Sequence, residues 1–335
     1  MKSTIKEVAK KAGVSISTVS RVLNNNQKGY SRETKEKVLK AIAELQFSPN
    51  AIARGLVRKK TQTIAVIMPE LSSLFSTKVL HGIEETANDH HYSVFICNAS
   101  LNGERTLRYV EFLKEKQVDG IIFLSQNLTE QVHQALEKTD IPVILVSSIS
   151  EEFPYPFVKV DDYQAAYDAT SFLIDKGHTS IAMISGTFKD AIAGKPRLKG
   201  YQQALADHEI ELNDELIEFG NFSYQSGSAC MEALLNKNSK FTAVFAASDE
   251  MAVGALNKAH QFGINVPEQL SIIGYDNTQL AEMSFPRLTT LSQSLEKMGE
   301  LAVDHLIAIM KDEPFNQTCI LPHSIIERET VKSLL

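Results

Sequence analysis

The apolar residues of the first 45 positions recur at helical spacing, whereas those after Thr63 form short continuous runs. Three stripes with steps of three and four residues contain Ile5, Val8 and Ala9; then Val19, Val22 and Leu23; then Thr34, Val38, Leu39, Ile42 and Leu45. This spacing places side chains on one face of a helix, so the pattern predicts three short helices around a small shared core.

Residues that cap helices stand before each stripe. Thr4 is followed three positions later by Glu7, which is the spacing of a capping box. Ser15 and Ser31 precede the second and third stripes, and Gly13 permits a sharp turn after the first. A helix, a tight turn and a second helix with a polar outer face form the helix-turn-helix arrangement that enters the major groove of DNA.

The runs after Thr63 are rich in Ile and Val and predict buried strands. There are eight: TIAVIMP, YSVFICN, VDGIIFLS, IPVILVSS, FVKVDD, SIAMISG, FTAVFAAS and LSIIGYD. Amphipathic stretches lie between many of them, at 78–90, 105–116, 165–176, 197–206 and 250–262. Strands alternating with helices indicate parallel sheets covered on both faces, and eight units favour two α/β lobes with a cleft at the carboxyl ends of the strands.

The net charge of −7 conceals two opposite parts. Residues 1–60 contain 14 Lys or Arg and four Asp or Glu, a balance of +10, so the remainder carries −17. A basic N-terminal segment on an acidic body indicates that the segment meets a polyanion. Within it, Arg21 can donate two hydrogen bonds to guanine, Ile16 can touch a thymine methyl, and Ser17 faces the same groove.

Composition excludes several other classes. The 335 residues contain no apolar run of 18, and the start lacks the apolar core of a signal peptide, so we expect a cytoplasmic protein without a membrane segment. The three cysteines, Cys97, Cys230 and Cys319, form no CxxC pair and are expected to be reduced thiols. We expect no metal site and no cofactor.

The sequence resembles the LacI/GalR family of repressors over essentially its whole length. The resemblance is carried by TIKEVAKKAGVSISTVSRVLNN, FSPNAIARGL, TIAVIMP, GIEETA, VDGIIF, DKGH, RLKGY, SDEMAVGAL, IIGYDN, LTTLSQSLEKMGELA and LPHSIIER. KQVDGIIF, IDKGH and IIGYDNT resemble most the branch that contains the catabolite control proteins. The resemblance implies an all-α helix-turn-helix headpiece followed by a two-lobe α/β core like that of periplasmic sugar-binding proteins.

On this basis we expect a DNA-binding domain at 1–47 and a hinge helix with linker at 48–60. The core would span 61–335, with one lobe at about 61–160 and 292–323 and the other at about 161–291 and 324–335. In the family the hinge folds only on operator DNA and inserts a leucine, here Leu56, into the minor groove; a segment this short is unstable alone. The expected DNA-binding residues are Thr4, Ser15, Ile16, Ser17, Thr18, Ser20, Arg21, Asn24, Ser31, Asn50, Ala53 and Leu56.

The resemblance also implies a sugar effector between the lobes. Arg197 would donate to sugar hydroxyls, Asp276 would accept from them, and Phe222 would stack on an apolar sugar face. Further candidates are Ser248 at a strand end, Gln293 at a lobe crossover, Leu74 and Phe75 in the first lobe, and Asp161, which we prefer to its neighbour Asp162. For Leu74 and Phe75, core packing is an equal alternative.

Two alternatives stay open. The first, which the resemblance to the catabolite control branch implies, is a regulator whose coeffector is serine-phosphorylated HPr. In that branch a helix presents basic residues to HPr; the corresponding stretch here is MGELAVDHLIAIMK, where Asp304 and Ala308 take the place of positive charge and disfavour this partner. The second is an enzyme, but no GxSxG, P-loop or HExxH motif supports one, and we expect no catalytic activity. Paired half-sites require a homodimer, and the ending IIERETVKSLL is too short for a tetramerising heptad segment.

Overall fold

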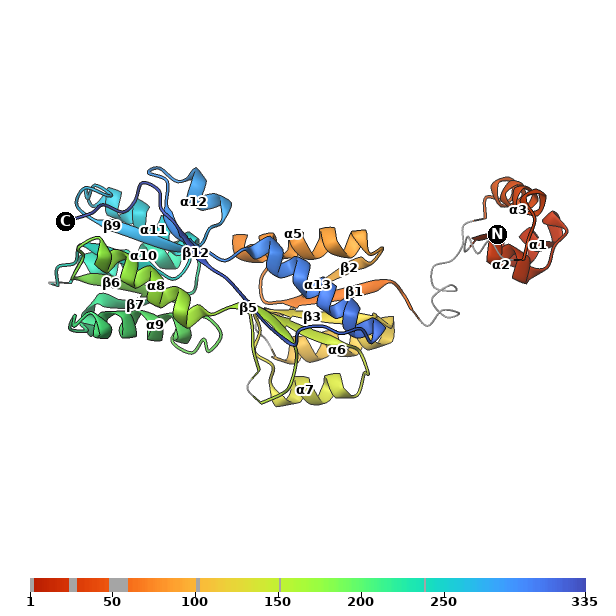
Figure 1. The fold of residues 1–335 in the computed structure, drawn as a ribbon, viewed down its shortest axis with the longest axis horizontal. Coiled ribbons are helices and arrows are strands. Elements are labelled where there is room, and N and C mark those ends of the chain that lie inside the picture. Colours follow the sequence, from red (N-terminus) through yellow and green to blue (C-terminus); the bar gives the residue numbers. More distant parts are fainter. Residues whose placement is uncertain (1–2, 24–28, 48–59, 101–102, 151, 238) are drawn as a thin grey trace. The chain divides into compact units, whose positions relative to one another are not determined.

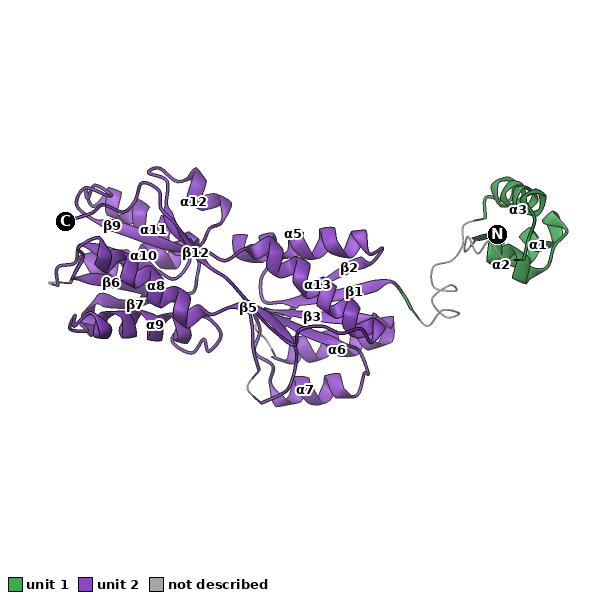
Figure 2. Ribbon diagram, viewed as in Figure 1, with its two compact units in different colours: residues 1–61 green, residues 62–335 purple. Residues whose placement is uncertain are grey.

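A computed structural model describes residues 3–23, 29–47, 60–100, 103–150, 152–237 and 239–335 (Figure 1). The chain divides into two compact units, an N-terminal unit at Met1–Thr61 and a second unit at Gln62–Leu335 (Figure 2). Asn24, Asn50, Ala53 and Leu56, and with them the expected hinge helix, lie outside the described residues. The proposed three-part division with a hinge at 48–60 therefore stays a prediction.

The described residues of the N-terminal unit form α1 (Ile5–Ala12), α2 (Ile16–Leu23) and α3 (Arg32–Glu44). Its helix starts confirm the predicted caps: Thr4 N donates to Glu7 Oε2 at 2.6 Å, and Glu7 N donates to Thr4 Oγ1 at 3.4 Å. Ser15 Oγ accepts from Thr18 N, and Ser31 Oγ accepts from Thr34 N. Gly13 ends α1 with a left-handed φ of 67°, as a glycine permits.

The small core of this unit contains Val8, Ala9, Val19, Val22, Val38 and Ala41. The predicted third stripe was wrong at Leu39, whose side chain is 47% exposed. Val38 and Leu39 are adjacent, so they point about 100° apart on α3 and only one of them can face the core. Ala41, which is 3% exposed, completes the buried face.

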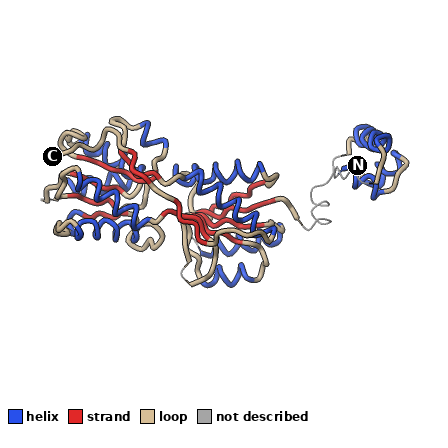
Figure 3. The backbone as a smooth tube through the Cα atoms, in the orientation of Figure 1, coloured by secondary structure: helices blue, strands red, loops and turns tan. Residues whose placement is uncertain are grey.

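The second unit is built on two six-stranded sheets (Figure 3). The sheet of the first lobe has the order β11-β5-β4-β3-β1-β2, and every pairing in it is parallel. Its strands are β1 (Thr63–Met68), β2 (Ser93–Asn98), β3 (Gly120–Leu124), β4 (Val143–Val146), β5 (Phe157–Val160) and β11 (Thr318–Leu321). Its helices are α5 (Leu74–Asp89), α6 (Gly103–Lys116), α7 (Glu130–Glu137) and α13 (Leu295–Lys311).

The sheet of the second lobe has the order β12-β10-β9-β8-β6-β7 and is parallel except for the antiparallel pair of β10 and β12. Its strands are β6 (Ile181–Ser185), β7 (Ile217–Phe219), β8 (Ala243–Ala246), β9 (Ser271–Asp276), β10 (Thr289–Ser292) and β12 (Ser324–Ile326). Its helices are α8 (Asp162–Asp175), α9 (Gly194–Asp207), α10 (Tyr224–Leu235), α11 (Asp249–Gln261), α12 (Gln279–Met283) and the 3₁₀ turn Asp214–Leu216.

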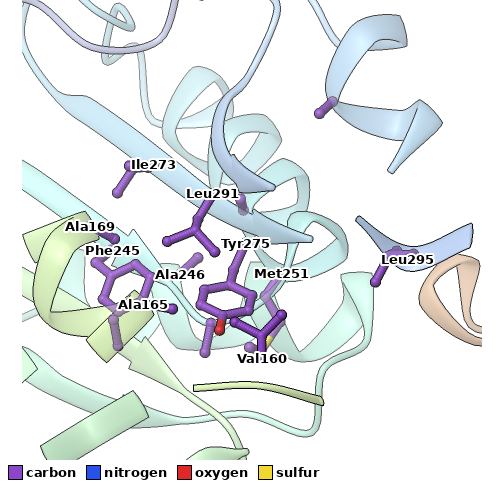
Figure 4. Close-up of a cluster of buried hydrophobic side chains, with 14 of the residues drawn as sticks. Val160, Ala165, Ala169, Phe245, Ala246, Met251, Ile273, Tyr275, Leu291 and Leu295 are labelled. Carbon is purple, nitrogen blue, oxygen red and sulfur yellow. The ribbon is translucent and has the colours of Figure 1, made fainter. Parts of the chain in front are cut away.

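The chain passes from one sheet to the other three times: after β5, after β10 and after β11. Each of the eight predicted runs contains a strand. The prediction of burial was wrong for β2, which lies at the edge of its sheet with Phe95 43% and Ile96 46% exposed. The runs missed β7, β11 and β12, which are partly exposed strands, and β10, whose buried residues include Thr289 and Thr290. The core of the second lobe packs around Phe245 and Tyr275 (Figure 4).

Glycines lie where the paired helices of the second unit touch. A Cβ on Gly82 of α5 would lie 2.1 Å from Glu296 O, and a Cβ on Gly254 of α11 would lie 2.2 Å from Tyr224 O. Gly200 gives α9 the same close approach to Tyr163 O of α8. Figure 1 shows α5 and α13 side by side in the first lobe. Backbone contacts of this kind fix how each helix pair crosses.

Within the described part of the chain, no helix combines the length and the apolar character that crossing a membrane requires. Cys97 and Cys230 are buried, Cys319 is half-buried, and all three are free thiols. Burial raises the pKa of Cys97 and of Cys230 to about 11, so both are protonated at neutral pH.

Candidate functional site

The outer face of α2 carries the side chains that the sequence indicated for base contacts. Ile16 is 45% exposed, and Ser17 and Arg21 are exposed, while Val19 and Val22 point into the core. A Cβ on Gly29 would lie 2.8 Å from Arg21 Nη1, so the guanidinium lies against the backbone of Gly29. The helix thus presents a polar face of the size that a major groove admits.

Most of the remaining described candidates lie at helix starts. Ser15 Oγ lies 2.7 Å from Ser17 Oγ and 2.8 Å from Thr18 Oγ1, and it also caps α2. Thr4 caps α1 and Ser31 caps α3, while Ser20 is half-buried. Capping residues hold backbone N–H groups at helix starts, where phosphate oxygens of DNA bind. Contacts of all these residues with DNA stay a prediction.

Arg197 is the centre of a buried polar cluster in the second lobe. It lies on α9 and is 3% exposed. Its Nε donates to Asp162 Oδ1 at 2.9 Å, and Nη1 donates to the carbonyl of Ala247 at 2.6 Å. The guanidinium carbon lies 3.7 Å from the centre of the Tyr275 ring. Burial opposes the charge, but Tyr275 and Asp162 outweigh it and raise the pKa of Arg197 above its usual value.

The carboxylate beside Arg197 belongs to Asp162, although the sequence interpretation preferred Asp161. Asp161 is exposed and serves as the N-cap of α8, where Oδ1 accepts from Tyr163 N and Gln164 N at 3.1 Å. Asp162 is 3% exposed and also contacts Lys159 Nζ at 3.2 Å. The turn after β5 decides which neighbour points inward, because a capping residue must keep its oxygen over the helix start.

Asp276 and Gln293 meet at the edge of the second sheet. Gln293 Nε2 donates to Asp276 Oδ1 at 2.6 Å, and both side chains are buried. Asp276 ends β9 with a φ of 117°, a conformation that L-residues rarely adopt and that clusters at functional sites. Burial raises the pKa of Asp276 well above its usual value; Arg197 lowers it, and the neighbouring Asp249 raises it further.

Asp249 is a buried residue that the sequence reasoning did not propose as a site. Its Oδ2 accepts from Thr278 N at 2.6 Å and from Thr278 Oγ1 at 3.0 Å, and Oδ1 accepts from Thr290 Oγ1 at 2.5 Å. Burial raises its pKa to about 6, against the lowering effect of the bonds from Thr290 and Thr278. The sequence could have indicated Asp249 by its position, because it directly follows the capping Ser248 after the carboxyl end of β8.

Phe222 and Ser248 join the cluster through the backbone. Ser248 Oγ donates to the Phe222 carbonyl at 3.1 Å and accepts from Met251 N at 3.2 Å, so it caps α11. The Phe222 ring centre lies 5.8 Å from the Arg197 guanidinium. A Cβ on Gly186 would lie 2.2 Å from this ring, so a glycine is required for the ring to occupy its place.

Five predicted effector residues therefore come together: Arg197, Phe222, Ser248, Asp276 and Gln293. Asp276 ends β9, Phe222, Ser248 and Gln293 follow β7, β8 and β10, and Arg197 lies on α9. All five lie at the carboxyl edge of one sheet, where α/β proteins bind ligands. Leu74 and Phe75 lie on α5 in the first lobe; Phe75 packs on the apolar core, and Leu74 N donates to Glu250 Oε1 of the second lobe at 3.0 Å. Whether these residues touch a ligand stays a prediction.

Comparisons with known proteins agree with both units. Residues 4–50 match the family described as bacterial regulatory proteins, lacI family, and residues 170–331 match the periplasmic binding protein-like domain. Catabolite control protein A of Priestia megaterium is 40% identical over 99% of this chain and 100% of its own length. This chain belongs to the LacI family. The LacI-family regulators share its helix-turn-helix unit, so the predicted class of DNA-binding transcriptional regulator is confirmed.

Solved structures of LacI-family proteins show the same fold. The lac repressor dimer bound to operator and the anti-inducer ONPF is 28% identical, with a TM-score of 0.90 over 99% of this chain and 100% of that one. A complex of the transcriptional regulator CelR with cellobiose is 30% identical, with a TM-score of 0.75 over 98% and 100%. The predicted fold class, a helical headpiece followed by a two-lobe α/β core, is confirmed.

Proposed function

We propose that this LacI-family regulator represses a carbohydrate-utilisation operon and that a sugar or sugar phosphate between its lobes controls its binding to operator DNA. The observation that carries this proposal is the convergence of Arg197, Phe222 and Asp276 at one sheet edge. Donors, carboxylate oxygens and an aromatic face are the groups that hold a polyol. The cellobiose complex of CelR, a protein 30% identical, supports the same class of ligand.

On DNA, the protein would act as a homodimer in the cytoplasm. A two-fold symmetric dimer presents two copies of α2 to the half-sites of a pseudopalindrome. Arg21, Ser17 and Ile16 would read bases, and Leu56, outside the described residues, would wedge the minor groove. The ligand would shift the equilibrium between two lobe angles, which the hinge transmits to DNA.

We further propose that the bound sugar dissociates without chemical change and that the protein catalyses no reaction. The buried carboxyl group of Asp249 supports this view, because both of its oxygens already accept hydrogen bonds from threonines. The thiols of Cys97 and Cys230 are buried with raised pKa values, which makes them poor nucleophiles.

The test is a thermal-shift screen against mono- and disaccharides, each with and without phosphate. A sugar that raises the melting temperature is then added during titration of the protein with selected operator DNA. We expect at least one sugar to change operator affinity about tenfold or more, the size of an ordinary coupling between two sites. A protein stabilised by purines and by no sugar would contradict the proposal, as would chemical turnover of the bound sugar.

A second candidate coeffector is serine-phosphorylated HPr, which the resemblance to the catabolite control branch implies; catabolite control protein A of Priestia megaterium is 40% identical to this chain. The charge on the surface of α13 disfavours binding of phosphorylated HPr. Asp304 Oδ1 lies 3.2 Å from His90 Nε2, which places a carboxylate where a phosphoserine would need positive charge. A pull-down with HPr and with phosphorylated HPr decides between them, and tight binding of the phosphorylated form alone would favour the second candidate.

A further inference from the structure

The start of α5 in the first lobe is capped by a residue of the second lobe. Ser73 occupies the N-cap position of α5, but its side chain makes no capping hydrogen bond. The first backbone N–H of the helix, that of Leu74, instead donates to Glu250 Oε1 at 3.0 Å. Glu250 lies in the first turn of α11, so this hydrogen bond joins the two lobes. A helix start needs such acceptors, because its first N–H groups have no partner within the helix.

The electrostatics of the contact strengthen this link. Each helix carries partial positive charge at its N-terminus, and at this contact the first turns of α5 and α11 share one carboxylate. The start of α11 has its own cap, since Ser248 Oγ accepts from Met251 N. Glu250 is therefore not needed to begin α11, and its carboxylate is available to α5. Removing it would leave the start of α5 without this acceptor, while Asp249 stays in the first turn of α11.

Burial and a neighbouring negative charge both disfavour the ionised form of Glu250 at this position. Its side chain is half-buried, burial raises the pKa of its carboxyl, and the nearby charge of Glu70 acts in the same direction; only the N–H of Leu74 opposes them. A carboxylate free in solvent would avoid both penalties. The hydrogen bond to Leu74 is thus the contact that keeps the side chain at the lobe boundary.

We propose that Glu250 is an interlobe latch, which stabilises the approach of the two lobes by capping α5 from the opposite lobe. Closing the lobes brings Glu250 to Leu74, and opening them leaves the start of α5 without that acceptor. The latch therefore biases the lobe angle before any ligand adds its own contacts. Its consequence for ligand affinity rests on the proposed function: a ligand that prefers the closed lobes binds more weakly when fewer molecules are closed.

Four variants of the full-length protein test the latch. Glu250→Ala removes the acceptor, whereas Glu250→Gln keeps an amide oxygen in its place. Ser73→Asp gives α5 a capping carboxylate from its own lobe and repels Glu250. Glu232→Ala is the matched control, because Glu232 forms its ion pair with Lys258 on α11 within the second lobe.

The first measurement is hydrogen exchange of the Leu74 amide. We expect at least tenfold faster exchange in Glu250→Ala and rates near wild type in Glu250→Gln and Glu232→Ala. The Met251 amide, which Ser248 caps, should keep its protection in all of them and show that α11 is intact. Unchanged exchange at Leu74 in Glu250→Ala would overturn the proposal.

The second measurement is the distance between the lobes, from spin labels at the exposed positions Glu115 of α6 and Gln225 of α10. Labelled chains are diluted into unlabelled protein so that one pair is observed. We expect a distribution shifted from wild type in Glu250→Ala and Ser73→Asp, and an unshifted one in Glu250→Gln and Glu232→Ala. Identical distributions in all variants would overturn the latch. No ligand is added, so this outcome is independent of whether a sugar is the effector.

Discussion

The guanidinium carbon of Arg197 lies over the ring of Tyr275, 3.7 Å from its centre, and both side chains donate to the same oxygen of Asp162. The Tyr275 hydroxyl donates to Asp162 Oδ1 at 3.2 Å. Burial is the main cause that raises the pKa of Tyr275 well above its usual value, so the hydroxyl keeps its proton. The buried Arg197 guanidinium thus contacts Tyr275 of β9 and Asp162 at the start of α8, and it also lies near the ring of Phe222.

Replacing Arg197 separates its structural role from its proposed ligand role. Arg197→Ala leaves Asp162 buried without its main partner, which we expect to lower the free energy of unfolding by about 3 kcal/mol. Arg197→Lys restores a charge but not the planar fork, so stability should partly recover while sugar response stays at least tenfold weaker. Denaturation and sugar titration measure the two effects, and operator binding should survive in both. Wild-type sugar affinity in Arg197→Lys would contradict the ligand role.

The recognition role of Arg21 predicts loss of sequence discrimination. We expect Arg21→Ala to weaken binding to a selected operator about tenfold, because one bidentate contact to guanine contributes roughly 1–3 kcal/mol. Arg32→Ala is the control: Arg32 is equally charged and exposed, but it begins α3 and pairs with Glu36. It should cause a smaller loss that is the same on operator and scrambled DNA. Anisotropy titrations at several salt concentrations distinguish the two results.

Asp249 predicts a pH dependence of stability. Its pKa in the folded protein is about 6, above the usual value of roughly 3.9 in an unfolded chain. The folded state therefore binds this proton more tightly, and the free energy of unfolding falls as pH rises from about 4 to about 6. Asp249→Asn should lack this component, which amounts to no more than about 3 kcal/mol. Urea denaturation of both proteins across pH 4–8 measures the difference; parallel curves would show that Asp249 does not titrate there.

The close helix pairs predict a strong effect of one methyl group. Gly254→Ala places a Cβ 2.2 Å from Tyr224 O, and because backbone cannot yield as a side chain can, we expect a loss of about 2 kcal/mol. Gly103→Ala is the matched control, since a Cβ at Gly103 on α6 meets nothing within 4 Å. Thermal or urea unfolding measures both. An equal effect of the two substitutions would show that helix propensity alone matters at Gly254.

Local features were predictable from the sequence, and features that depend on two distant segments were not. Thr4 and Glu7 are three residues apart, so their mutual capping follows from the chain alone. Asp161 and Asp162 are neighbours of the same type, and the turn geometry after β5 decides which one reaches Arg197. The hydrogen bond between Glu250 and Leu74 joins residues 176 positions apart, so the sequence around either residue does not predict it.

The three passages between the sheets have a consequence for synthesis on the ribosome. The sheet of the first lobe needs β11 at Thr318–Leu321, and the sheet of the second needs β12 at Ser324–Ile326. Neither sheet can be completed until these two strands have left the ribosome, whereas α1 to α3 end at Glu44. The N-terminal unit can therefore fold early on the nascent chain, while both lobes have to wait for the same late segment that carries β11 and β12.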